Sequence, residues 1–178
     1  MLVRFSLIAA TLLATGVTEA SKSRPALDTE AVRNLCAAVE LQSTEMHPLY
    51  PGNRYTYQTY FMKWAGVADQ DGDVVRNRKI REFINDNMAK LLCNQFNFNP
   101  RNGNILKLAV AKQSTNFVRD AVQLWHVDLN QVDAADGKTV LDYISDRRAS
   151  AGAAFRKTLD RYYVIFRDAG ALHAGEIK

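Results

Sequence analysis

Two stretches of the chain carry the same order of local signals, a tight turn and then a capped helix, about 35 residues apart. In the second stretch Asp136-Gly137 favours the turn, and Thr139 can accept a hydrogen bond from the first free N–H groups of a helix whose buried face opens at Leu141. In the first stretch Gly103-Asn104 precedes Leu106 in the same way. A period of this length is typical of stacked helix pairs, so the sequence predicts an all-α fold.

The second stretch, which Asp128-Leu129-Asn130 precedes and Ala169-Gly170-Ala171 closes, resembles an ankyrin repeat. The resemblance covers about residues 83–172 and implies a short ankyrin-like array. It places helices over 105–111, over 116–125, from 139 to 144 or beyond, and from 155 or 159 to 169. Val140 and Asp142 stand where the family usually has proline and histidine. The polar stretch 146–152 is longer than the family pattern and is interpreted as an insertion between two helices.

An N-terminal helical cap is expected over residues 21–82. Asp28 can cap a helix that reaches Leu41, because apolar residues return at helical spacing between them. Residues 74–93 show the same spacing. Between these segments lies an aromatic cluster of Tyr55, Tyr57, Tyr60, Phe61 and Trp64. It forms either the core of the cap or an exposed patch that binds a partner, and the sequence does not distinguish these two alternatives.

Residues 1–20 have the pattern of a secretory signal peptide: Arg4, an apolar run over 5–17 and the small residue Ala20 before a polar segment. The run is too short to span a bilayer. We therefore expect a periplasmic or secreted protein whose single domain covers 21–178. Cys36 and Cys93 are the only cysteines, and an even number in an exported chain favours a disulfide between them. Two separately buried thiols are the alternative.

The sequence offers no recognisable catalytic, cofactor or metal site. It has no Gly-x-Ser-x-Gly elbow, phosphate loop or dinucleotide fingerprint, and its three histidines have no convincing catalytic spacing. A calcium loop turning at Gly72 would need carboxylates where Val67 and Arg78 stand. The formal net charge of +4 is far from the dense basic stripe of a nucleic-acid binder. We expect neither an enzyme nor a nucleic-acid-binding protein, and no cofactor.

The ankyrin resemblance implies binding of another protein through turn tips and inner helices. The candidate contact residues are Asn102, Asn104, Lys107, Asp136, Lys138 and Asp142. Arg147 and Arg148 in the predicted insertion are further candidates, with a plain solvated loop as the alternative. Trp125 and His126 lie either at the rim of the binding surface or in the packing between units.

An exported scaffold of this kind suggests a protein that binds and neutralises or chaperones one partner, for example an immunity protein against a toxin delivered into the cell envelope. The alternatives are a structural or stress-protective envelope protein without a single partner and, behind it, a hydrolase with an unrecognised site. The identity of the partner and the oligomeric state are not predicted.

Overall fold

The structure is a computed structural model that describes residues 26–41, 57–96 and 103–178. The expected signal peptide, Tyr55 and the predicted contact residue Asn102 lie outside these ranges. The described helices are α1 (Thr29–Leu41), α2 (Tyr57–Trp64), α3 (Asp73–Asn87), α4 (Ile105–Ala111), α5 (Thr115–Arg119), α6 (Val140–Ser150) and α7 (Ala153–Asp168), with short turns η1 (Cys93–Gln95), η2 (Asp120–Leu124) and η3 (Ala174–Glu176). In these ranges no strand forms, and Leu92 pairs with Asn104, and Asp133 with Lys138, as isolated β-bridges. The predicted all-α class is confirmed.

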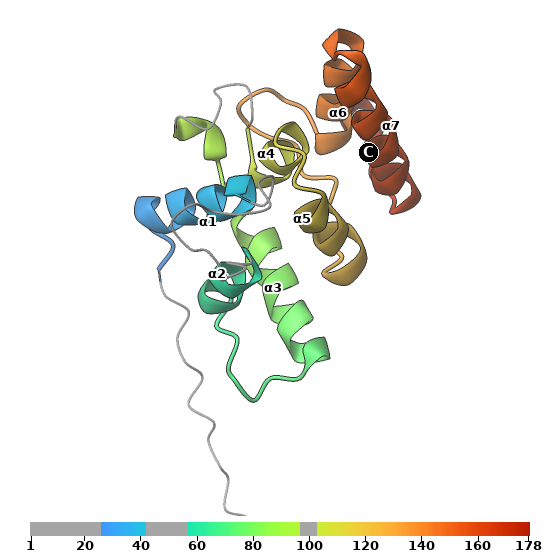
Figure 1. Ribbon diagram of the computed structural model, residues 1–178. Helices are drawn as coiled ribbons and strands as arrows, with labels where there is room; N and C mark the ends of the chain where they lie inside the picture. The colour runs from blue at the N-terminus through green and yellow to red at the C-terminus, as the bar shows by residue number, and fades with distance from the viewer. Residues whose placement is uncertain (1–25, 42–56, 97–102) are drawn as a thin grey trace, which may run out of the picture.

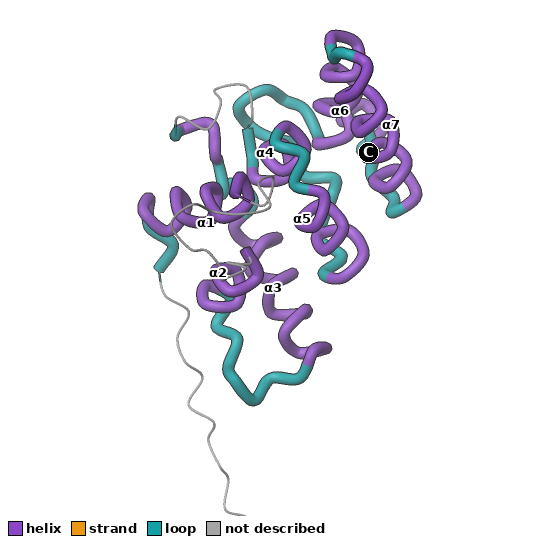
Figure 2. Tube along the Cα trace, in the orientation of Figure 1, coloured by secondary structure: helices purple, strands orange, loops and turns teal. Residues whose placement is uncertain are grey.

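The helices are arranged roughly in chain order, with α1–α3 on one side of the molecule and the hairpin of α6 and α7 on the other (Figure 1). α1 packs against α2 and α4, α4 packs against α5 and α6, and α6 packs against α7. Every residue of α4 from 105 to 110 is buried. In the tube view α4 therefore marks the centre of the molecule, and α6 and α7 lie together at one edge (Figure 2).

α1 begins where the sequence indicates, because the Asp28 carboxylate accepts a hydrogen bond of 2.8 Å from the Ala31 N–H group. The helix buries one face, which includes Leu35 and Cys36. Cys36 forms a disulfide with Cys93 of η1, as expected. The disulfide joins the first helix to the segment that leads into α4.

Two residues of the aromatic cluster, Tyr57 and Phe61, lie in the core and not in an exposed patch. Tyr57 and Phe61 are 2% and 0% exposed, and their rings lie 5.4 and 5.5 Å from the ring of Phe117 in α5. Trp125, which is 1% exposed, packs on both. Trp125 therefore packs back onto the cap region, whereas His126 is exposed and adopts a positive φ of 53°, which His tolerates better than most residues.

The structure corrects two sequence-based expectations about helix ends. α3 ends at Asn87, and the chain then leads to η1, where Leu92 pairs with Asn104 and Cys93 is bonded to Cys36. Residues 146–150 are not an inserted loop but the last turns of α6, which is separated from α7 by two residues. Arg147 and Arg148 lie in the last turn of α6, where cations interact favourably with the helix dipole.

Candidate functional site

The two helix pairs α4–α5 and α6–α7 are connected through a buried polar contact, here called the first joint, which consists of Asn104, Lys107, Asp133 and Asp136. Asn104 caps α4, and its side-chain oxygen accepts from the N–H groups of Leu106 and Lys107. The ammonium group of Lys107 lies 3.2 Å from Asp133 and 2.6 Å from Asp136. The side chains of Lys107 and Asp133 have no exposed surface, so both charges are neutralised inside the fold.

Asp133 organises the turn that leads into α6. Its carboxylate also accepts hydrogen bonds of 2.9 Å from the N–H groups of Asn104 and Ala135. Its backbone carbonyl accepts from Gly137, which adopts a φ of 69°. One carboxylate therefore connects the start of α4, the tight turn and the buried lysine.

The first joint requires glycine at position 103. A Cβ atom there would lie 1.8 Å from Oδ2 of Asp133. That carboxylate cannot retreat without breaking its contacts with Asn104 and Lys107. Gly103 is therefore required by close approach and not by its φ angle.

We expect Gly103→Ala to lower the free energy of unfolding by about 2 kcal/mol or more, because overpacking of a tightly packed site is destabilising. Urea denaturation would measure this. Gly175→Ala is the matched control, since a Cβ there meets nothing within 4 Å, and it should stay within about 0.5 kcal/mol of the wild type. Equal stability of the two variants would contradict the geometry of the first joint.

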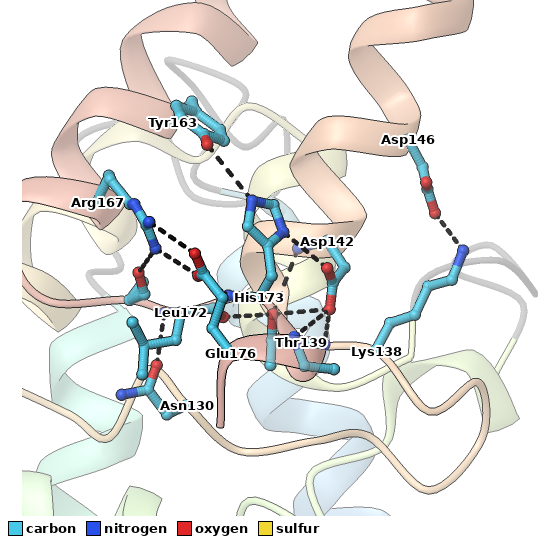
Figure 3. A network of polar contacts seen from close by, with 12 residues as sticks. Asn130, Lys138, Thr139, Asp142, Asp146, Tyr163, Arg167, Leu172, His173 and Glu176 are labelled. Atoms are coloured by element: carbon cyan, nitrogen blue, oxygen red, sulfur yellow. Dashed lines mark hydrogen bonds and ion pairs between the residues drawn. The ribbon is translucent and has the colours of Figure 1, made fainter. Parts of the chain in front are cut away.

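A second joint, which consists of Thr139, Asp142, Leu172, His173 and Ala174, connects α6 to the C-terminal turn η3 (Figure 3). Thr139 caps α6 and forms a capping box with Asp142. Oδ1 of Asp142 lies 2.7 Å from Nδ1 of His173, and Oδ2 accepts from the Ala174 N–H group. The Thr139 hydroxyl lies 2.8 Å from the carbonyl oxygen of Leu172.

The two joints are built at equivalent positions. In each, the N-cap residue and the residue three places later contact the turn that follows the helix pair. The capping residues are Asn104, Thr139 and, for η3, His173. The charge is reversed between the joints, because Lys107 in the first corresponds to Asp142 in the second. This correspondence gives the Asp142–His173 pair a structural explanation.

The imidazole of His173 has a carboxylate at one nitrogen and, 3.4 Å from the other, the hydroxyl of Tyr163 (Figure 3). A base oriented by an acid next to a hydroxyl is the arrangement that activates nucleophiles. Here, however, η3 is also fastened by a bidentate ion pair of Arg167 and Glu176, with N–O distances of 2.6 and 2.8 Å. These contacts all hold the C-terminal turn against α6 and α7.

The second joint should be acid-sensitive. Burial opposes ionisation of Asp142, but N–H donors of Ala174 and Thr139 and the contact with His173 hold its pKa at about 2. The bidentate Arg167 contact lowers the pKa of Glu176 to about 2. Unfolded carboxyl groups titrate at about 4, so the stabilisation is complete above that pH and is lost as the pH falls toward 2.

We expect the stability of the wild type to fall more steeply than that of Asp142→Asn between about pH 5 and pH 2.5, because the variant has no carboxyl group to titrate at that position. Urea denaturation at a series of pH values measures both slopes. Parallel curves for the two proteins would show that Asp142 does not contribute to the acid sensitivity.

The predicted contact residues have different environments. Asn104 and Lys107 are buried in the first joint, and Asp142 is engaged in the second, so these three hold the fold together. Asp136 and Lys138 are exposed at the turn tip, where Asp136 binds Lys107 and Lys138 pairs with Asp146.

The two arginines of α6 are largely occupied by α7. Arg147 lies over the ring of Phe155, with 5.9 Å between the guanidinium carbon and the ring centroid. Arg148 pairs with Asp160 at 2.7 Å and lies over the ring of Tyr163. Neither is part of a solvated loop, and both contribute to the packing of the hairpin.

Sequence reasoning missed Asp133 and His173, which complete the two joints. A sequence signal for both joints was present. Lys107 and Asp142 each stand three residues after the N-cap of their helix, and both are charged.

A second buried polar contact lies between α2 and η2, which is a turn of π-helix. Tyr57 donates its hydroxyl proton to Asp120, and Gln58 donates to the same carboxylate at 2.7 Å. Burial and the contact with Asp120 raise the pKa of Tyr57. Asp120 is 3% exposed, so this contact fastens α2 to the following helix pair.

A cavity of about 60 Å³ beside the first joint, lined by Met88, Leu92, Gln131 and Val132 among others, has room for water but not for a drug-sized ligand. No group of three metal-ligating side chains occurs among the described residues. None of their helices is both long and apolar enough to cross a membrane.

No protein-family model, curated protein or solved structure matches the chain in the three comparisons made.

Proposed function

We propose that the chain is an exported protein-binding module, a diverged ankyrin-like array that holds one partner protein. The observation that carries this proposal is the correspondence of the two joints: the first connects α4–α5 to the turn before α6, and the second connects α6 to the turn that follows α7, each through the N-cap residue and the residue three places later. Arrays of stacked helix pairs act by presenting extended surfaces to other proteins. The turn tip between the two pairs is exposed from Ala134 to Lys138.

The disulfide supports export. Cys36 and Cys93 are both fully buried and bonded to each other. Structural disulfides persist in the periplasm and outside the cell and are rare in the reducing cytosol. The signal-peptide pattern of residues 1–20 supports the same location.

Within this class we propose a periplasmic protein that binds and neutralises or chaperones its partner, with an immunity protein against an envelope-targeted toxin as the specific form. The immunity form predicts that a deletion strain loses fitness only beside attacking neighbours. Loss of fitness under general envelope stress alone would instead favour the structural or stress-protective alternative.

The proposed function is tested by affinity capture from the envelope fraction with protein purified from cells that express the full chain. A captured protein must bind in a stoichiometric ratio when repurified, as isothermal titration calorimetry measures. Ala135→Trp should weaken binding about tenfold or more, because Ala135 is exposed at the turn tip and a bulky side chain there would obstruct a partner.

Gln123→Trp is the matched control, since Gln123 is exposed on η2 and away from the turn tip. Asp136 and Asp142 are unsuitable for this test because both hold other residues in place. Recovery of folded protein with no stoichiometric partner would contradict the proposal.

A further inference from the structure

The hairpin of α6 and α7 packs against the preceding helix pair along its inner side. On its inner side Tyr162 contacts Thr115 at 2.8 Å and Thr158 contacts Gln113 at 3.3 Å, and both partners belong to the preceding helix pair. The outer side of α7 faces away from the rest of the described chain at the edge of the molecule (Figure 1). The residues exposed along that side are Ala153, Lys157, Arg161, Val164 and Asp168.

The first three turns of this outer side form a basic surface. Lys157 and Arg161 are exposed there, and neither has an ion partner among the described residues. The acids close in sequence are already engaged, since Asp160 pairs with Arg148 and Glu176 with Arg167. Asp168 limits the basic surface at the far end of the helix.

The side chains of this surface favour one kind of binding partner over others. A second copy stacked as a further repeat would need an apolar face, but Val164, which is 55% exposed, is the one large aliphatic side chain exposed on α7. A bilayer would need a much larger apolar face on the same helix. Unpaired cations one helical turn apart, with an aliphatic residue beside them, are complementary to an acidic amphipathic protein segment.

We propose that the outer side of α7, centred on Lys157, Arg161 and Val164, is the docking surface for an acidic segment of the partner protein. This inference rests on the proposed function, because it assigns the chemistry of the partner that the module holds. The cations at positions 157 and 161 pair with carboxylates spaced four residues apart on a partner helix, and Val164 packs against an aliphatic residue between them.

The test uses a fluorescently labelled helical peptide with glutamates spaced four residues apart, and it measures fluorescence anisotropy with the full chain. We expect the double variant Lys157→Glu, Arg161→Glu to bind the peptide about tenfold more weakly or worse, since two attractive pairs become repulsive. The control Arg78→Glu, Arg81→Glu changes the net charge equally on α3 and should weaken binding less than about twofold. Lys157→Ala, Arg161→Ala should show an intermediate loss and guards against misfolding of the reversal variant.

Equal weakening in the α7 and α3 variants would overturn the inference, because net charge alone would then explain the binding. Binding to phosphatidylglycerol vesicles or single-stranded DNA in preference to the peptide would also overturn it, as would no peptide binding at all. A stoichiometric envelope partner that binds the α7 variants normally would overturn this inference while leaving the proposed function intact.

Discussion

Asp133→Ala is expected to lower the free energy of unfolding by about 3–5 kcal/mol, because it leaves the ammonium group of Lys107 buried beside only one partly exposed carboxylate. The variant also deprives the N–H groups of Asn104 and Ala135 of their acceptor. Urea denaturation followed by circular dichroism would measure the change. The large effect follows from burial and not from the number of ion pairs.

Lys138→Ala is the matched control, since Lys138 forms an ion pair with Asp146 in which both side chains are about half exposed. Its loss should change the free energy of unfolding far less than Asp133→Ala does, because exposed ion pairs contribute little. The double variant Lys107→Met, Asp133→Asn should be less destabilised than the sum of its single variants, because neither charge is left alone. If Asp133→Ala were no more destabilising than Lys138→Ala, the claim that the first joint is buried and stabilises the fold would be contradicted.

Loss of the disulfide has the second large expected effect. The bond between Cys36 and Cys93 spans 57 residues of sequence, and closing a loop of that length stabilises the fold by about 4 kcal/mol in the chain-entropy model. We therefore expect Cys36→Ala, Cys93→Ala to unfold at a much lower urea concentration than the oxidised wild type.

The control is the effect of a reducing agent. Dithiothreitol should lower the unfolding midpoint of the wild type toward that of the double variant and leave the double variant unchanged. A wild-type midpoint that is the same with and without reductant, after thiol titration shows complete reduction, would contradict a stabilising disulfide.

The starts of helices were predictable because their signals are local. Asn104 and Thr139 cap α4 and α6 as their turn residues and spacing indicate, and Asp28 caps α1. The predicted helix 105–111 has the bounds of α4. Gly170 follows α7 with a φ of 88°, the conformation expected of a glycine that ends a helix.

The functions of charged residues were less predictable, because they depend on partners distant in sequence. Lys107 reads as a surface lysine, but Asp133 lies 26 residues later and makes its burial possible. The sequence places Arg147 and Arg148 in an insertion that either contacts a partner or is a solvated loop, but α6 continues through both, and they pack on Phe155 and pair with Asp160. The polarity of a segment therefore did not show whether it faces solvent or another helix.

The candidate contact surface changed for the same reason. The predicted set is divided between exposed turn-tip residues, such as Lys138, and residues that the joints occupy, such as Lys107 and Asp142. The basic side of α7 was not singled out, because its cations lie among acids in the sequence. Only the ion pairs show that Asp160 is occupied and that Lys157 and Arg161 remain.

The measurement that tests partner binding most directly is photo-crosslinking in the living cell. A photoreactive phenylalanine analogue is placed at Ala135 on the turn tip, at Val164 on α7 or at Gln123 on η2, three exposed positions on different parts of the surface. A binding module predicts one protein adduct at Ala135, the same partner at Val164 and no adduct at Gln123. Absence of an adduct at all three positions, in a protein that is folded and exported, would contradict the account.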